Sequence, residues 1–436
     1  MSVYRSWRAP LFCFLLAGCL PVFGAGFALY QGSARGNAQG GLPAAGDDAS
    51  AIFYNPAGIT NLEGTHFMAG MTLITPSADL SLTNTYTGRV TTAEPQDDFF
   101  IPPHVYYSRP IDDNLWLGIG VFSRFGLGSE FEDDFAGRYN SIDANIETIE
   151  FNPNIAWKVN DQISLAAGVR IMYLDVLLEG TVDASPLLGI DERNNPETTT
   201  YDVNQRVTGD ALGYGFNFGL FYRMNQQWSF GVSYYSEVKQ EVDNGAVKFK
   251  KPAGLPDTLF LDSPGTAELD LPAMAFFGAS YKPSEAWSLT FGAVYTGWES
   301  FDEIRLEFDR PIIIIPGLGV GVTETVSPEN WQDSWKYNIG AEFRVTDAIW
   351  VQTGFVYDDS PLREETIDYR LPTNDRTLIN LGTTFNTGEW TISLAVNYLT
   401  IKDRDLPDQQ LADGVLPSTV RNGGAILTAF SIGRQF

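Results

Sequence analysis

The chain has 436 residues, enough for one large domain or for two of ordinary size. It carries 54 acidic and 28 basic residues, a net charge of −26, so the phosphates of a nucleic acid would be repelled. A mean hydropathy of −0.10 with 19% charged residues is too polar for a bundle of membrane-spanning helices, yet 13% aromatic residues is high for a soluble protein.

Residues 1–24 have the pattern of a secretory signal peptide. Two arginines precede the apolar run LFCFLLAGCL, and the residues VFG before Ala25 offer a cleavage site. An alternative stays open, because LAGC, which ends at Cys19, is the pattern of a lipoprotein cleavage box. The chain has two cysteines, Cys13 and Cys19, so cleavage before Ala25 leaves no thiol for a disulfide or a metal site.

Residues 25–64 are predicted to form a small N-terminal domain before the strands begin. Within it, the stretch GDDASAIFYNPAGITNL contains the triplet Asn55, Pro56 and Ala57. Helical water channels carry paired copies of this triplet, but here there is one copy and no spanning helix after the signal. The proline favours an extended Asn55, whose amide can then bind backbone or wall groups, so we expect the triplet to pin this segment inside the lumen, against the region of Asp358, Asp359 and residues 370–376.

From residue 65 to the C-terminus, the hydrophobic pattern has a period of two residues. In EWTISLAVNYLT, for example, Trp390, Ile392 and Leu394 alternate with small or polar residues. Fourteen such segments are predicted as strands, and they lie at 65–80, 99–109, 114–123, 149–158, 162–179, 211–224, 227–238, 272–282, 286–298, 335–345, 349–358, 377–386, 389–400 and 424–436.

Three features favour a transmembrane barrel over a soluble sandwich. Tight turns such as PIDDN alternate with long connections such as 239–271, the rhythm of an even-stranded bacterial barrel. Tryptophans follow several tight turns, as an aromatic girdle at a membrane interface requires. The chain ends on an alternating strand with Phe436 last, which resembles the strand read by the barrel assembly machinery. We therefore predict an all-β fold over residues 65–436, a 14-stranded antiparallel transmembrane β-barrel of the outer membrane.

Three segments are similar to the FadL family of long-chain fatty acid transporters of the Gram-negative outer membrane. They are AGFALYQGSARGNAQGGLPAAGDDASAIFYNPAGI, the stretch from FGLGSEFEDDF to IAWKVND, and, near the C-terminus, DSWKYNIGAEFRV with YDDSP and RLPTNDR. The resemblance implies a 14-stranded barrel, an N-terminal hatch in its lumen, and capture of an apolar ligand at extracellular loops. It also implies an internal pocket and lateral release through an inward kink of the third strand, here NLWLGIGVFSRFG.

The candidate ligand contacts combine this resemblance with the composition of the loops. Long connections carry apolar runs that would form a binding groove, or could instead pack a small core of their own. Lumen-facing basic residues would anchor a ligand carboxylate, with Arg376 a further candidate near a rim. The predicted contacts are Phe27, Leu187, Leu188, Ile190, Leu255, Leu259, Phe260, Leu261, Ile313, Ile315, Arg170, Lys336 and Arg344.

The hatch and gate residues follow from the same resemblance. The new N-terminus would reach the pocket, and glycines in the third strand would permit the kink. The predicted hatch and gate residues are Ala25, Gly26, Asn55, Pro56, Ala57, Gly118 and Gly120.

The sequence thus predicts outer-membrane transport of long-chain fatty acids, with aromatic or aliphatic hydrocarbons as the alternative cargo. A general diffusion porin is less favoured, because a hatch and apolar loops do not suit polar solutes. No enzyme activity is expected, since His66 and His104 both lie away from the long-loop rim. We expect no cofactor, no metal and no nucleic acid, and a monomer that contacts membrane lipid and lipopolysaccharide.

Overall fold

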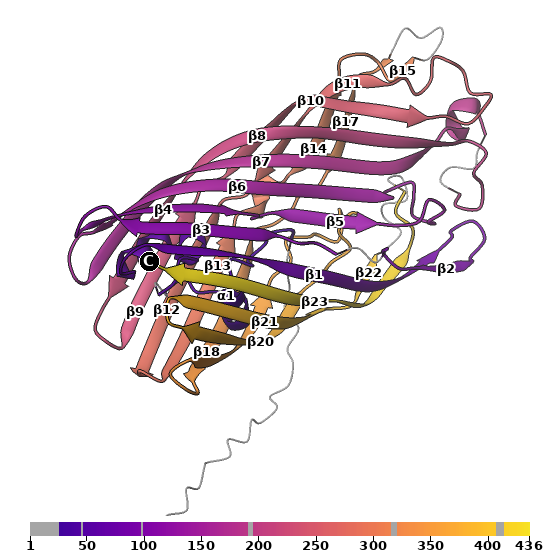
Figure 1. Cartoon of the computed structure of the whole chain (residues 1–436). Coiled ribbons are helices and arrows are strands. Elements are labelled where there is room, and N and C mark those ends of the chain that lie inside the picture. Colours follow the sequence, from indigo (N-terminus) through magenta and orange to yellow (C-terminus); the bar gives the residue numbers. More distant parts are fainter. Residues whose placement is uncertain (1–25, 45–46, 97–98, 191–194, 315–320, 407–413) are drawn as a thin grey trace, which may run out of the picture.

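The computed structural model describes residues 26–44, 47–96, 99–190, 195–314, 321–406 and 414–436, so the predicted signal peptide and Ala25 lie outside these ranges. The described chain forms a closed antiparallel barrel of 14 strands, several of which are interrupted and carry two labels (Figure 1). The strands are β1 (His66–Thr83), β2 (Val90–Ala93), β3 (Pro103–Pro110), β4 (Leu115–Phe122), β5 (Gly126–Glu130), β6 (Asp143–Lys158), β7 (Ile163–Asp183), β8 (Asp202–Arg223), β9 (Trp228–Tyr235), β10 (Val238–Lys250), β11 (Ser263–Leu271), β12 (Met274–Ser284), β13 (Trp287–Thr296), β14 (Glu303–Phe308), β15 (Ile313–Ile314), β16 (Gly321–Val322), β17 (Glu324–Pro328), β18 (Ser334–Arg344), β19 (Ile349–Asp358), β20 (Arg376–Thr387), β21 (Trp390–Ile401), β22 (Arg404–Leu406) and β23 (Ser418–Gln435).

The barrel closes where its first strand meets its last. Strand β1 pairs with β23 from His66 opposite Gln435 to Leu82 opposite Ser418, and with β3 on its other side. Each of the fourteen predicted segments overlaps a strand of the wall, and the prediction of a 14-stranded antiparallel barrel is confirmed. Tight turns join the strands at the end that holds the C-terminus, here called the short-turn end, and the long connections lie at the other, the long-loop end (Figure 1).

Alternation along each strand gives the wall an apolar outside and a mixed inside. In β21, Leu394 and Val396 are 45% and 52% exposed, whereas Ala395 and Asn397, which alternate with them, are buried in the lumen. An apolar outer face combined with full strand pairing is what a lipid environment requires of a barrel. No helix in the described ranges is long and apolar enough to span a membrane.

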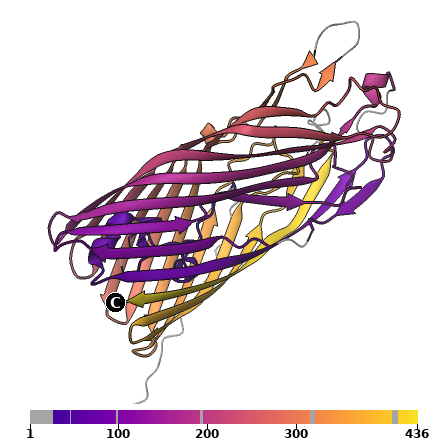
Figure 2. The same cartoon turned by 45° about the horizontal axis from the view of Figure 1, so that its top comes forward.

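The wall is taller on one side than on the other. Strands β7 and β8 have 21 and 22 residues, whereas β18 and β19 on the opposite side have 11 and 10. Figure 2 shows the longer strands continuing toward the long-loop end. The four strands of the wall between β8 and β19 are interrupted, so that β10, β11, β14 and β17 form an upper sheet beyond β9, β12, β13 and β18.

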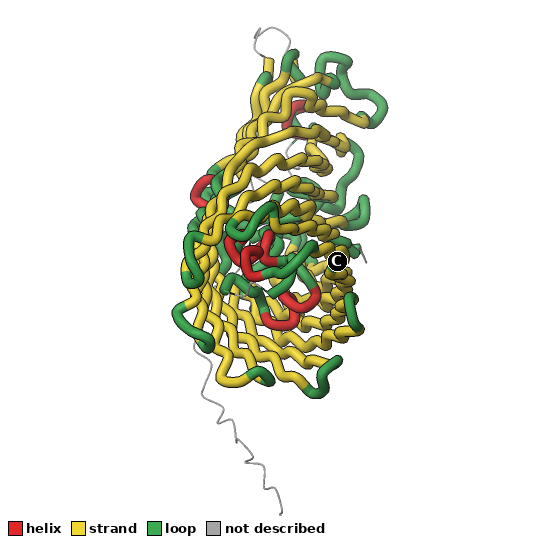
Figure 3. The backbone as a smooth tube through the Cα atoms, turned by 60° about the vertical axis from the view of Figure 1, so that its left-hand side comes forward, coloured by secondary structure: helices red, strands yellow, loops and turns green. Residues whose placement is uncertain are grey.

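Residues 26–44 and 47–62, here together called the inner segment, lie inside the barrel. The segment contains the helices α1 (Ala34–Gln39), α2 (Ala51–Tyr54) and η1 (Pro56–Asn61), and Figure 3 shows them enclosed by the strands. Two further single turns, η2 (Ser185–Leu188) and η3 (Trp298–Ser300), lie in the long connections. Side chains from around the wall hydrogen-bond to the inner segment, namely Thr72, Tyr106, Trp116, Ser164, Ser233, Thr290, Asn338, Asn397 and Ser431.

Helix α1 begins and ends at residues suited to those positions. The Ser33 side chain accepts from the Gly36 amide at the N-terminus, and Gly40 ends the helix with a left-handed φ of 77°. Glycines of the wall let the helix approach closely. A Cβ on Gly354 would lie 2.8 Å from the carbonyl carbon of Gln39 and 3.0 Å from the Ala38 oxygen. The wall is therefore shaped to the backbone of α1.

We predict that Gly354→Ala weakens the seat of α1. The added methyl group has no free space, so α1 must move away from β19 and leave room for water and ions. The expected result is a higher ion conductance in planar bilayers than for the wild type. Gly433→Ala is the matched control, because its Cβ would lie no closer than 3.5 Å to any neighbour. Equal conductance of the wild type and both variants would contradict a close fit.

Candidate functional site

The third strand of the barrel is broken after Phe122. Its first part, β4, pairs with β3 on one side and with β6 on the other, but its second part, β5, pairs with β6 alone. Arg124 and Phe125 are consecutive and both fully buried, so alternation is interrupted as in a bulge. Gly118 and Gly120 lie in the paired part, where a Cβ would meet Ile59 or Ile52 of the inner segment.

The N-terminal residues of the inner segment hydrogen-bond to the strand at this break. The Leu29 amide donates to the Arg124 carbonyl at 2.8 Å, and the Gly126 amide donates to the Phe27 carbonyl at 3.0 Å. On the other side, the Thr148 hydroxyl accepts from the Phe125 amide at 3.1 Å and donates to its carbonyl at 2.7 Å. Backbone groups that lost their ladder partners are thus paired again.

A buried cluster of charges fixes the strand beside the break. The Arg124 Nε lies 3.3 Å from Glu150, its Nη2 donates to the Phe53 carbonyl, and its guanidinium lies 4.1 Å from the Tyr235 ring centroid. Arg170 binds the same carboxylate through two bonds of 2.9 Å. Both arginines and Glu150 are 0% exposed. Arg170, a predicted ligand anchor, therefore serves a buried ion cluster and does not line the cavity described next.

An apolar cavity of about 1370 Å³, including its part open to solvent, lies beside β5. It is here called the lumen cavity. Phe27, Leu29 and Tyr30 of the inner segment form its floor, and apolar side chains of β1, β20, β21 and β23 form the wall opposite β5. The wall side chains are Ile74, Leu378, Leu399, Ile401 and Leu427. A mainly apolar cavity with a few polar groups is the usual form of a site for a hydrophobic ligand.

Three charged side chains of the lumen cavity lie side by side on neighbouring strands, here called its cationic end, because Lys336 of β18 is opposite Asp358 of β19, which is opposite Arg376 of β20. Lys336 donates to the Gly40 carbonyl and lies 4.9 Å from the Tyr30 ring centroid. Arg376 also lines the cavity, and its Nε has no hydrogen-bond partner among the described residues, like Oδ1 of nearby Asp358. Two cations beside one carboxylate give this end a positive balance, which suits an anionic head group.

Beside the lumen cavity, Phe27 belongs to an aromatic cluster that fixes the start of the inner segment. Its ring lies 4.8, 5.4 and 5.5 Å from the rings of Trp298, Phe301 and Trp331. Gly26 precedes it in a tight space, since a Cβ there would lie 2.6 Å from Trp298. The sequence indicated Phe27 and Gly26 as site residues. It gave no signal that Trp298 and Trp331 contact them inside the barrel.

The predicted apolar loop residues separate into two groups. The first group, Leu255, Leu259, Phe260 and Ile313, packs with Ala184 and Val203 into a small core above the barrel. The second group, Leu187, Leu188, Ile190 and Leu261, is exposed or half-buried outside that core, and Ile315 lies outside the described residues.

A second apolar cavity, narrow and with a total space of about 630 Å³ that includes its part open to solvent, lies in the tall part of the wall between β6, β7, β8, β10, β11 and β14. Inward side chains such as Leu174, Val207 and Leu306 line it. Ile146 of β6 lines this cavity and the lumen cavity alike, so the two are neighbours along an apolar surface.

The Asn55 amide joins the inner segment to the opposite wall. Its backbone is extended with φ of −160°, and its Nδ2 donates to the Leu220 carbonyl at 2.9 Å and to the Pro43 carbonyl at 3.3 Å. Its Oδ1 accepts from the Ala57 amide at 3.2 Å, which places Pro56 at the first turn of η1. The triplet therefore begins η1 and also bonds to β8. The expected partner region, Asp358, Asp359 and residues 370–376, was wrong, because the Asn55 bonds described here go to Pro43, Ala57 and Leu220.

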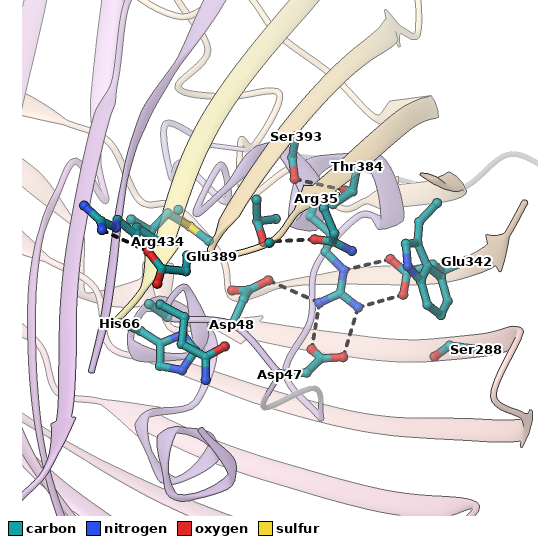
Figure 4. Close-up of a pocket in the computed structure, with 18 of the residues that line it drawn as sticks. Arg35, Asp47, Asp48, His66, Ser288, Glu342, Thr384, Glu389, Ser393 and Arg434 are labelled. Atoms are coloured by element: carbon teal, nitrogen blue, oxygen red, sulfur yellow. Dashed lines mark hydrogen bonds and ion pairs between the residues drawn. The ribbon is translucent and has the colours of Figure 1, made fainter. Parts of the chain in front are cut away.

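A polar pocket lies at the short-turn end, below α1 (Figure 4). Arg35 is its centre, with two bonds of 2.7 Å to Glu342 of β18 and bonds of 2.7 and 3.0 Å to Asp47. Burial alone would raise the pKa of Asp47, but Arg35 and Lys282 hold that pKa well below its ordinary value. Arg344 lies near this end too, 3.7 Å from exposed Glu285, and far from the lumen cavity lining.

The two histidines take part in local contacts. His66 at the short-turn end bonds to the Glu63 carbonyl, and buried His104 bonds to the Ser431 hydroxyl at 2.8 Å. That hydroxyl also accepts from the Ala34 amide at the start of α1. Among the described residues, no group of three or more potential ligands forms a metal site.

We predict that Asn55→Ala loosens the inner segment. The substitution removes two hydrogen bonds to carbonyls that stay buried, and each unpaired group costs about 1–3 kcal/mol. The expected result is a raised leak conductance in planar bilayers with an intact barrel by circular dichroism. Asn160→Ala is the control, because Asn160 bonds only within a tight turn. If the leak conductance of Asn55→Ala equals that of the wild type, other contacts are sufficient to hold the inner segment in place.

The chain is similar to known outer-membrane proteins along its length. The profile of the family described as outer membrane protein transport protein (OMPP1/FadL/TodX) matches residues 16–436. The long-chain fatty acid transport protein of Escherichia coli K12 is 26% identical over 420 residues, which covers 89% of this chain and 92% of that protein.

Solved structures agree in fold. A FadL homologue of Pseudomonas aeruginosa matches with a TM-score of 0.82 and 22% identity over 94% of this chain and 100% of that one. The toluene transporter TbuX of Ralstonia pickettii matches with a TM-score of 0.66 and 17% identity over 93% and 98% of the two chains. The protein is an outer-membrane β-barrel and belongs to the outer membrane protein transport protein family (OMPP1/FadL/TodX).

Proposed function

We propose that the protein transports long-chain fatty acids across the outer membrane by way of the lumen cavity. The observation that carries this proposal is the form of that cavity, which has an apolar wall and a cationic end with Lys336 and Arg376. An acyl chain would occupy the apolar part, and its carboxylate would accept hydrogen bonds from the two cations. The name of the Escherichia coli relative supports the same class of cargo.

The route begins at the long-loop end. Exposed Leu187 and Leu188 offer an apolar surface for capture, and the cavity in the tall wall lies between that surface and the lumen cavity. Ile146 belongs to both cavities, so a ligand would move along apolar side chains without entering water. The inner segment acts as a hatch that closes the lumen toward the short-turn end.

The exit is lateral, at the break between β4 and β5. The edge of β5 that faces away from β6 has no strand beside it in the described chain, and this edge lines the lumen cavity. A ligand could therefore pass into the membrane without displacing α1. The bonds of Phe27 and Leu29 to this strand make the first residues of the inner segment the part that senses an occupied cavity.

Hydrocarbons are the second candidate cargo, and the apolar wall of the cavity favours them equally. TbuX, a solved structure with the same fold, is named a toluene transporter. The cationic end separates the two candidates, because a hydrocarbon has no group that could accept hydrogen bonds from Lys336 or Arg376.

Binding to the purified protein in detergent tests the proposal. We expect labelled oleate to bind, and Lys336→Met to weaken its binding about tenfold or more, since a hydrogen bond to a charged group contributes roughly 1.5–3 kcal/mol. Arg344→Met is the matched control, because Arg344 lies at the short-turn rim. Binding of toluene should be unchanged in both variants.

Two outcomes would overturn the assignment. Wild-type protein that binds toluene but not oleate would favour hydrocarbon as the cargo. Equal loss of oleate binding in Lys336→Met and Arg344→Met would mean that general charge matters and that the lumen cavity does not hold the carboxylate.

A further inference from the structure

We propose that the side chain of Phe100 is the door of the lateral exit. It closes the gap between β1 and β5 at rest, and it must rotate for a ligand to pass between the lumen cavity and the membrane. The inference rests on the proposed function, because it gives the lateral route a specific moving part.

The first observation is a short edge of β5 that lacks backbone partners. At its start, the Gly126 amide bonds to the Phe27 carbonyl, and at its end, the Glu130 carbonyl accepts from the Gln96 amide. Between these bonds, residues 127–129 pair with β6 on one side and with no backbone group of the described chain on the other. Among the described residues, this edge is therefore covered by side chains only.

The second observation is that the ring of Phe100 covers this edge. A Cβ on Gly128 would lie 1.9 and 2.0 Å from Cε1 and Cζ of Phe100, so the ring rests directly on bare backbone. Gly126, on the same face of β5, is covered in the same way by Leu29, whose Cδ1 would lie 3.2 Å from a Cβ. Any side chain at position 128 would overlap the Phe100 ring and prevent it from packing against β5.

The third observation fixes the direction of that face. The Ser129 hydroxyl donates to the carbonyl of Tyr369, which belongs to the main buried core. Leu127 and Ser129 lie opposite buried Ile146 and Ala144 of β6, so they face the lumen, whereas Gly128 lies opposite Asn145 on the outer face of β5. Phe100 and Gly128 both line the lumen cavity, so the ring covers this outer face where β5 borders the cavity.

The fourth observation is that Phe100 has a fixed backbone and outward-facing neighbours. Its amide and carbonyl pair with those of Ile74 on β1, at 3.0 and 2.9 Å. Phe99 and Ile101 are 62% and 46% exposed, whereas Phe100 is half-buried. The ring thus stands between the cavity and the outer surface. Rotation about its own side-chain bonds opens the edge without breaking any backbone hydrogen bond.

Release of a bound ligand into a membrane tests the door. Each protein is placed in nanodiscs and loaded with a fluorescent long-chain fatty acid, and transfer to acceptor vesicles is followed after mixing. We expect Phe100→Ala to release ligand about tenfold faster, a barrier lowered by about 1.4 kcal/mol. Phe99→Ala is the matched control, since it removes an identical ring one residue away from the exposed surface, and its rate should equal that of the wild type.

A double variant separates the door from a general loosening of the wall. In Phe100→Ala with Gly128→Leu, the leucine refills the space on β5 from the other side, and the release rate should return toward the wild-type value. Circular dichroism and resistance to heat in detergent verify that each barrel is folded. Equal rates for Phe100→Ala and Phe99→Ala, or no recovery in the double variant, would overturn the inference.

The same variants are also measured with labelled toluene. If the wild type binds toluene but not oleate, the proposed cargo fails, and the toluene release rates still decide whether Phe100 is the door. If oleate binds and all release rates agree, the proposed cargo holds and the door fails. The two proposals can therefore fail separately.

Discussion

The structure depends on one constraint, which is that every backbone amide and carbonyl in a lipid environment must have a hydrogen-bond partner. Regular pairing meets it through most of the wall, from β1 against β23 around to β21. The break after Phe122 violates it locally, and the molecule restores the missing bonds with unusual partners. A side-chain hydroxyl, Thr148, serves on one edge, and the start of the inner segment serves on the other. The functional features gather where regular pairing stops.

The inner segment therefore has two mechanical roles that belong to different parts of it. Helix α1 fits against wall glycines and, through Arg35, against Glu342, which anchors it in several directions. Residues Phe27–Leu29 contact the break and the lumen cavity instead. A disturbance of the cavity can reach these first residues while α1 keeps its position.

Most of the fold could be read from the sequence, whereas the site could be read only in part. A period of two over each strand, with tight turns between, is a local signal, and it located all fourteen strands. Phe27, expected from the resemblance, and Lys336, expected from its lumen phase in the strand, both line the lumen cavity, and their contact with a ligand stays a prediction. The position of the strand break was not readable from Gly118 and Gly120, because glycine in a strand serves a kink or a close approach equally, and here both glycines face the inner segment.

Other site residues depend on partners distant in the sequence. Arg170 and Lys336 have the same lumen phase, but Arg170 meets Glu150 across the β6–β7 pairing and is neutralised there. Phe100 contacts Gly128 only because β5 separates from the neighbouring strand, and the hydrophobic periodicity of the sequence does not indicate that separation.

Contacts of the inner segment with nearly every side of the wall also constrain how the protein is made. Side chains of β3, β9, β13, β18, β21 and β23 all bond to residues that precede β1 in the chain. A finished cylinder would offer these partners only through its ends, past tightly fitted glycines. The inner segment therefore has to be in place before β1 pairs with β23, because that pairing closes the wall around it.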